Sequence, residues 1–233
     1  MILDKERWFK WLGLLTMLAG AALVSTAVYT NVSVAVTSDD IDVFQQIGAR
    51  KPTASLNFDQ QIALIRKVQV EVFKRAPLGE GIPDYEKREP KDLMRIGQGL
   101  CFDRSRTFDK AFSYLGFETR HVYLLYKDKK SFFLSAVIHY GQSSHAVTEV
   151  KTDKGWMFVD SNTAWIALTR QGEPVNADDV WRRFGEFANP PAYLAYPWWA
   201  IRGMYSRKGQ LYGSGVVFPE FNWPTFFSWV IRG

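Results

Sequence analysis

The chain has 233 residues, of which 47% are hydrophobic and 15% aromatic, enough apolar side chain for one packed domain. Charged residues make up 23% and the formal net charge is +5, a balance that excludes wholesale disorder and predicts no nucleic-acid partner. A single cysteine excludes an intramolecular disulfide and leaves a choice between a buried apolar residue and a reactive thiol.

The N-terminal segment is predicted to cross a membrane. No charged residue occurs from Trp11 to Ser38, and residues 11–29 would span about 28 Å as a helix, roughly the hydrocarbon thickness of a bilayer. Three basic residues precede this run and three acidic residues are the first charges after it: Lys5, Arg7 and Lys10, then Asp39, Asp40 and Asp42. The positive-inside rule therefore predicts a cytoplasmic stub at residues 1–10, an anchor at 11–30 and an extracytoplasmic remainder.

A cleavable signal peptide is the alternative for this segment. Ser25, Thr26 and Ala27 offer small residues at a cleavage position. The apolar run is longer than a usual signal core, which favours a single-pass anchor in the inner or plasma membrane. Both interpretations put the rest of the chain in the periplasmic or extracellular space.

A linker and a helix are predicted to follow the membrane segment. Residues 31–54 are expected to be a linker with some strand character, because three valines alternate there: Val32, Val34 and Val36. An amphipathic helix is predicted over residues 56–76, with Asn57 as its N-cap and Pro77 as its stop.

The central part of the sequence predicts a second helix followed by strands. Residues 78–99 are expected to be a loop with a short helix near 92–95. A second amphipathic helix is predicted from Cys101 to Leu115, ended by Gly116. Strands are predicted at residues 119–126, 132–140, 146–151 and 156–160, the last two joined by a hairpin turn at 152–155.

Aromatic residues dominate the sequence from Asn189 onward. A short helix is predicted at residues 224–231. We expect these rings to pack on the core. Lining of a substrate cleft and contact with a membrane surface are the alternatives.

The position of Cys101 favours a reactive thiol. Gly97 and Gly99 precede it, and a predicted helix begins at it. The positive end of a helix dipole lowers the pKa of a thiol, and the unpaired N–H groups of the first turn can receive an oxyanion.

A thiolate nucleophile needs a general base and a group that orients the base, and the predicted hairpin offers both. If the hairpin has a two-residue turn, Val147 faces Asp160, and His145 lies on the same face as Asp160, about 7–8 Å away at Cα. A three-residue turn with a bulge would put the two side chains on opposite faces. The predicted roles are nucleophile for Cys101, general acid and base for His145, and orienter of the imidazole for Asp160.

Four segments resemble the core of the transglutaminase-like superfamily. In order, they are Cys-Phe-Asp-Arg-Ser-Arg-Thr-Phe at 101–108, Leu-Gly-Phe-Glu-Thr-Arg-His-Val at 115–122, His-Ala-Val-Thr-Glu-Val at 145–150 and Gly-Trp-Met-Phe-Val-Asp at 155–160. In that family the nucleophilic Cys starts a helix, and strands carrying the His and the Asp follow. The resemblance implies an α+β, papain-like fold with an antiparallel sheet packed on the Cys-bearing helix.

The resemblance also implies a catalytic core over residues 55–185. The aromatic-rich remainder, residues 186–233, is predicted to be an extension packed on this core. Val147 departs from the family, whose members commonly have an aromatic residue after the His-Ala pair. Gln98 is a candidate oxyanion donor by analogy with papain-like enzymes, although we favour a polar loop residue at this position.

Other polar residues are weaker candidates, and no cofactor or metal is expected. His121 and His139 are expected to be surface or satisfied core residues, since their spacing matches no zinc pattern. Glu149 is expected to be a solvated strand residue, with lining of the cleft as the alternative. Arg104 and Arg106 are expected to make caps and surface pairs, with steering of an acidic substrate as the alternative.

These predictions imply an extracytoplasmic, membrane-anchored thiol enzyme that acts on an amide or peptide bond through a thioester, as a protease, amidase or transamidase. The expected partners are the membrane and a protein, a peptide or an amide-containing cell-envelope substrate. The alternative is a catalytically silent, membrane-anchored scaffold, or a cell-envelope or polysaccharide-associated binding protein with the same fold.

Overall fold

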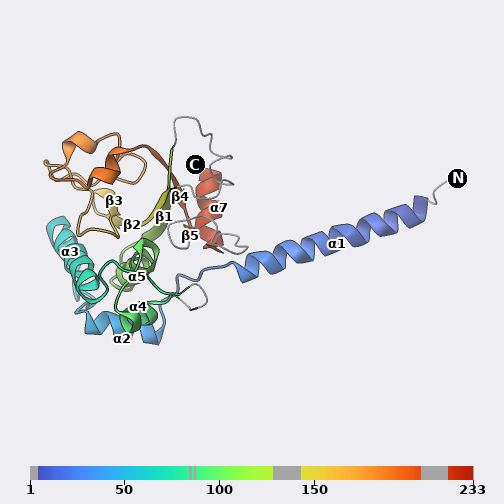
Figure 1. Ribbon diagram of the computed structural model, residues 1–233, viewed down its shortest axis with the longest axis horizontal. Helices are drawn as coiled ribbons and strands as arrows, with labels where there is room; N and C mark the ends of the chain where they lie inside the picture. Colours follow the sequence, from blue (N-terminus) through green and yellow to red (C-terminus); the bar gives the residue numbers. More distant parts are fainter. Residues whose placement is uncertain (1–4, 84–85, 87, 128–142, 206–219, 233) are drawn as a thin grey trace.

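The computed structural model describes residues 5–83, 86, 88–127, 143–205 and 220–232. It combines helices with a four-stranded antiparallel sheet, so the predicted α+β class is confirmed. One long helix extends away from all the other elements (Figure 1).

The long helix is α1 (Lys5–Tyr29), formed by the apolar N-terminal run. No residue of its section Trp8–Tyr29 is buried, and this section is long and apolar enough to cross a membrane. Membrane anchors and signal sequences share this property.

A helix stands where the sequence predicted a linker with strand character. Helix α2 (Ser38–Gln46) begins at Thr37, whose hydroxyl accepts a hydrogen bond from Asp40 N at 3.3 Å, while Asp40 Oδ2 accepts one from Thr37 N at 2.8 Å. This reciprocal cap starts a helix immediately after the alternating valines. The side chains of Val43 and Phe44 are buried in the core, so residues 38–46 are part of the packed fold.

Three further helices lie close to their predicted positions. Helix α3 (Phe58–Arg75) begins at the predicted cap, Asn57, whose side chain accepts a hydrogen bond from Gln60 N at 3.0 Å. Helix α4 (Pro90–Ile96) lies in the predicted loop, and α5 (Cys101–Tyr114) carries the cysteine at its start. The apolar faces of α3 and α5 share one core, formed by residues that include Ile65, Val68, Val72, Phe108, Ala111 and Phe112.

The sheet has the strand order β3-β2-β1-β4, and each neighbouring pair is antiparallel. Its strands are β1 (Thr119–Tyr126), β2 (Ser144–Thr152), β3 (Gly155–Val159) and β4 (Trp198–Arg202). Thr152 pairs with Gly155, which confirms the two-residue hairpin turn. The strand predicted at residues 132–140 lies outside the described residues.

Both faces of the sheet are covered. Along β1, Val122 and Leu124 belong to one apolar core and Tyr123 and Leu125 to another, because successive side chains of a strand point to opposite faces. Helix α5 packs against one face through β1 and β2. Residues from the segment 165–194 close the other face.

The aromatic C-terminal segment contributes to the sheet as well as covering it. Two 3₁₀ helices, η1 (Phe184–Glu186) and η2 (Ala192–Ala195), precede β4, which pairs with β1. Two short paired strands, β5 (Met204–Tyr205) and β6 (Glu220–Phe221), lead to α7 (Trp223–Arg232). Helix α7 confirms the short helix predicted near the C-terminus.

Candidate active site

Cys101 is the first residue of α5. The backbone before it approaches α4 closely, because a Cβ added at Gly99 would lie 2.6 Å from Leu93 Cδ1, so any larger residue would require the Leu93 side chain to move. Asp103 Oδ2 accepts a hydrogen bond from Leu100 N at 2.9 Å and so fixes the start of the helix. The thiol therefore stands at the positive end of α5, beside first-turn N–H groups that have no intrahelical acceptor.

The hairpin of β2 and β3 brings His145 and Asp160 together. Thr148 pairs with Val159, so the next facing residues are Val147 and Asp160, and His145 is a diagonal neighbour of Asp160. His145 Nε2 donates a hydrogen bond to Asp160 Oδ1 at 2.6 Å. The predicted contact between these side chains is present, and it leaves Nδ1 as the imidazole nitrogen available to a thiol.

The thiol of Cys101 and the imidazole of His145 interact, and each shifts the protonation of the other. Burial alone would raise the pKa of Cys101, but the hydrogen bond and charge of His145 bring it below the ordinary thiol value. Burial alone would lower the pKa of His145, but its bonds to Asp160 and Cys101 raise it to about 9. Both shifts favour a thiolate beside an imidazolium over a neutral thiol beside a neutral imidazole.

Asp160 is fully buried, and several donors besides His145 converge on its carboxylate. Asn162 N donates to Oδ1 at 3.3 Å, while Thr163 donates to Oδ2 through its backbone N–H at 2.9 Å and its hydroxyl at 2.6 Å. The Tyr193 hydroxyl also donates to Oδ2. Burial would raise the pKa of Asp160, but these donors and His145 lower it, so the group is a carboxylate at neutral pH.

A family comparison agrees with this geometry. The model of the transglutaminase-like superfamily matches residues 51–161, which include Cys101, His145 and Asp160. Residues 51–161 form a transglutaminase-like domain. A comparison with curated proteins finds no match to the chain. The predicted family is confirmed, while the catalytic roles of the three residues stay predictions.

Tyr193 is a residue of the candidate site that the sequence did not reveal. It lies in η2, beyond the matched residues, and its ring also makes an edge contact with His145 at 5.5 Å between centroids. No local pattern marks it among the other aromatic residues of the C-terminal segment. Asn162 and Thr163 did carry a signal, because an Asp followed by Ser, Asn and Thr is typical of turns in which the carboxylate accepts backbone N–H groups.

Arg104 supports the loop after Asp160. Its side chain is fully buried, so the predicted surface role and the alternative of substrate steering are both wrong. Its Nε donates to Ser161 O at 2.6 Å and its Nη2 to Asn162 Oδ1 at 3.0 Å. The Asn162 amide nitrogen then faces His145 Nδ1 at 3.5 Å. Arg106 is buried as well, which excludes the same surface role for it.

Gln98 points to a neighbouring loop. A Cβ added at Gly79 would lie 2.3 Å from Gln98 Oε1, so the amide packs against the Gly79 backbone. The structure gives Gln98 no hydrogen bond to any of the three candidate residues. This placement favours the loop residue that we expected over an oxyanion donor.

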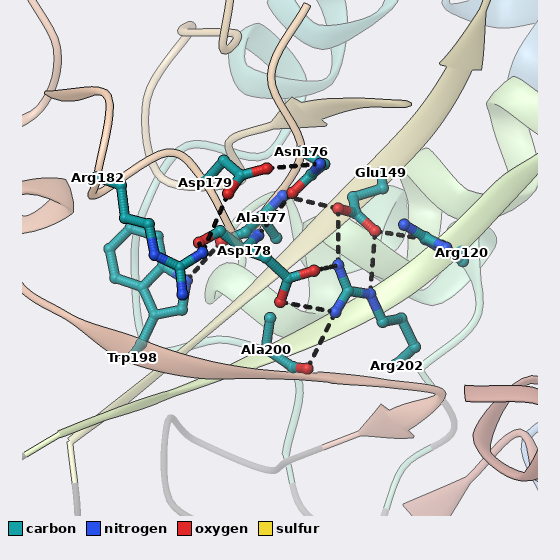
Figure 2. Close-up of polar contacts among 10 residues, drawn as sticks. All are labelled: Arg120, Glu149, Asn176, Ala177, Asp178, Asp179, Arg182, Trp198, Ala200 and Arg202. Carbon is teal, nitrogen blue, oxygen red and sulfur yellow. Dashed lines mark hydrogen bonds and ion pairs between the residues drawn. The ribbon is translucent and has the colours of Figure 1, made fainter. Parts of the chain in front are cut away.

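Glu149 belongs to a buried charge cluster, so its predicted solvation is wrong. Its carboxylate accepts hydrogen bonds from Arg202 at 3.2 and 3.3 Å, from Arg120, and from Ala177 N at 2.7 Å. Figure 2 shows the Arg202 guanidinium between Glu149 and Asp178, which it contacts at 2.6 Å. Strand β2 is central in the sheet, and the chain around Ala177 covers this face, which removes Glu149 from water and from any cleft.

The other histidines do not join the site. His121 is buried, lies 2.8 Å from Asp109 Oδ2 through its Nδ1, and stacks on Tyr205 at 3.8 Å between ring centroids. It is a core residue, the second of the two alternatives that we expected, but its Nε2 has no hydrogen-bond partner among the described residues. His139 lies outside the described residues, among which no cluster of three or more His, Cys, Asp or Glu side chains could hold a metal ion.

Proposed function

We propose that the protein is a membrane-anchored thiol enzyme that works outside the cytoplasm and acts on an amide or peptide bond through a thioester at Cys101. The observation that carries this proposal is the contact of Cys101 with His145, whose Nε2 donates to Asp160 at 2.6 Å. Superfamily membership adds support, because its members are generally cysteine enzymes, although some are inactive.

The first chemical step would be acylation of the thiol. The Cys101 thiolate attacks the carbonyl carbon, forming a C–S bond and a tetrahedral oxyanion. Backbone N–H groups at the start of α5 would donate hydrogen bonds to that oxyanion. As the C–N bond breaks, the His145 imidazolium gives its proton to the departing amine and becomes neutral.

The second step would release the acyl group. Neutral His145 takes a proton from a water molecule or an acceptor amine as its oxygen or nitrogen attacks the thioester carbon. The C–S bond breaks, and the thiolate and imidazolium are restored. Water yields a carboxylic acid and an amine yields a new amide, so the same residues serve a protease, an amidase or a transamidase.

Helix α1 and the contacts at its end support anchoring by an uncleaved segment. Trp223 Nε1 donates a hydrogen bond to Ala27 O at 2.8 Å, and Phe221 N donates to Thr30 O at 2.8 Å. Val32 N returns a bond to Phe221 O at 2.7 Å. The end of α1 is thus joined to the C-terminal segment by specific bonds. The substrates that fit this placement are proteins, peptides or amide-containing molecules of the cell envelope.

The proposal is tested by following acyl transfer from a library of peptide amides, with a fluorescent primary amine present as a competing acceptor. We expect an acyl adduct on Cys101 by mass spectrometry, then either free acid or labelled amide. The Cys101→Ala variant should form no adduct and show no turnover, while its unfolding temperature stays close to that of the wild type.

The matched control is Cys101→Ser, which keeps the shape of the site and replaces the thiol by a weaker nucleophile. Absence of any adduct, together with iodoacetamide labelling of wild-type Cys101 at the rate of an ordinary thiol, would reject the enzyme. That outcome would favour a silent scaffold or binding protein.

A further inference from the structure

Helix α7 carries an apolar surface that no other described part of the chain covers. Phe226 and Trp229 pack against the apolar cluster of Tyr123, Leu125, Ile201 and Met204. Three other apolar side chains of the same helix point away from the protein, with exposed fractions of 54%, 55% and 81%: Phe227, Val230 and Ile231. A protein surface seldom leaves three neighbouring large apolar side chains in water without a partner.

The polar side chains of α7 lie on the other side of the helix. Thr225, Ser228 and Arg232 line a groove shared with Arg120 and Arg202. At about 100° per residue, Val230 and Ser228 project about 160° apart. The helix is therefore amphipathic, with its apolar arc divided between the sheet and the open surface.

Helix α7 starts where α1 ends. The indole of Trp223, the first residue of α7, donates to Ala27 O in the last turns of α1. Asn222 Nδ2 donates to Val32 O at 2.9 Å and so fixes the chain just after α1 to the residue just before α7. Figure 1 shows α7 running crosswise to α1 at the side of the domain from which α1 leaves.

We infer that α7 lies in the outer surface of the bilayer, with Phe227, Val230 and Ile231 in contact with lipid. This inference rests on the proposed insertion of α1. A bilayer normal along α1 puts its surface at the level of Tyr29, next to Trp223, and a crosswise helix there lies in the membrane plane. Ten residues reach only about 15 Å, too short to span a bilayer, and the mixture of Trp, Phe and aliphatic residues is typical of the interface.

This arrangement would give the domain two attachments to the membrane. Helix α1 alone leaves the domain free to rotate and tilt about one point. A second contact along α7 fixes the face that the domain turns to the lipid, and with it the orientation of Cys101 relative to the membrane.

The test uses the full chain reconstituted in vesicles of phosphatidylcholine, in a Cys101→Ala background that carries one new cysteine labelled with a polarity-sensitive fluorophore. The informative position is Val230→Cys, and the matched control is Ser228→Cys on the polar side of the same helix. Brominated phosphatidylcholine quenches fluorophores that contact the acyl chains. We expect at least about twofold quenching at position 230 and little at position 228, as for a helix buried to the depth of the acyl boundary.

A third label at Met17→Cys, in the middle of α1, separates this inference from the proposed anchoring. Quenching at position 17 without quenching at position 230 would overturn the α7 inference and leave the anchor standing. Blue-shifted emission at position 230 without quenching by brominated lipid would also overturn it. The label would then lie in an apolar environment made by protein and not by lipid. Absence of quenching at position 17 would refute the anchoring itself.

Discussion

At the scale of single residues, the chemistry depends on how Cys101 and His145 share a proton. Burial opposes ionisation of both groups, but the contact with His145 lowers the pKa of Cys101, and Asp160 together with Cys101 raises the pKa of His145 to about 9. The two ionisations are coupled, so measured values belong to the pair. The reactive ion pair exists between the two pKa values.

This coupling predicts different pH profiles for acylation and for alkylation. Acylation by a peptide amide needs both the thiolate and the imidazolium, so its rate should rise as Cys101 ionises and fall again above about pH 9, where His145 loses its proton. Alkylation by iodoacetamide needs only the thiolate, so its rate should stay high above pH 9. Stopped-flow measurement of both rates checks this, and an alkylation rate that rises only near the ordinary thiol pKa would contradict the coupling.

The hydroxyl of Tyr193 should act on catalysis through Asp160. A hydrogen bond to a charged group contributes about 1.5–3 kcal/mol, so Tyr193→Phe should slow acylation by about tenfold, by weakening the carboxylate that holds His145. The matched control is Tyr196→Phe, because Tyr196 is 64% exposed and only three residues away. Rates of single turnover with a peptide amide measure both variants.

A double-mutant cycle with Asp160→Asn separates this positioning role from a structural one. If Tyr193 acts through the carboxylate, its removal in the Asp160→Asn background should have little further effect on the acylation rate. An undiminished tenfold loss in that background would mean that Tyr193 supports the site by another route, such as its ring contact with His145.

Some residues of the candidate site could be predicted from the sequence and others could not. The contact between His145 and Asp160 was predictable, because a hairpin register is a local feature, and the resemblance to the transglutaminase-like superfamily placed Cys101 with them. Tyr193 and Arg104 were not, because each reaches the loop after β3 from a distant part of the chain. Such contacts depend on the tertiary fold, which no short pattern encodes.

At the scale of elements, the buried charge cluster holds the sheet to its covering segment. Glu149 on β2 binds Arg120 on β1 and Arg202 on β4, so one carboxylate links three adjacent strands. Without this carboxylate, the positive charges of Arg202 and Arg120 would lose an ion-pair partner. Arg202 is almost fully buried and Arg120 is partly exposed. Glu149→Gln should therefore lower the free energy of unfolding by about 3–5 kcal/mol, the usual effect of breaking a buried pair.

Urea unfolding of this variant beside Glu118→Gln measures the effect. Glu118 pairs with Lys151 at 2.9 Å, but its side chain is 61% exposed, so the control should lose at most about 1 kcal/mol. Equal losses in the two variants would show that the cluster contributes no more than a surface pair.

Elements differed in how well the sequence predicted them. Helices α3 and α5 and strands β1 to β3 were predictable because each has a clear hydrophobic period and a stop signal. Helix α2 was missed because its valine-rich approach has a period of two, although Thr37 and Asp40 form a capping box in the sequence. Strand β4 was hidden in the aromatic segment, where Trp and Tyr suit a strand and a packed loop equally well.

At the scale of the whole molecule, the first and last parts of the chain meet. Residues just after α1 pair with β6, and Trp223 at the start of α7 bonds to Ala27. The membrane segment thus enters the domain through specific bonds rather than through a free linker. Among the described residues, only the C-terminal end of α1 takes part, so most of α1 should be dispensable for the fold.

A chain of residues 26–233 tests this division of roles, because it keeps Ala27, Thr30 and Val32 with their hydrogen bonds. It should unfold within about 2 °C of the full chain, since no buried contact is lost. Its acylation rate with a free peptide amide should equal that of the full chain. With the same peptide linked to a lipid in vesicles, it should be at least about tenfold slower, because tethering raises the effective substrate concentration. Loss of activity on the free peptide would instead mean that α1 holds the active fold together.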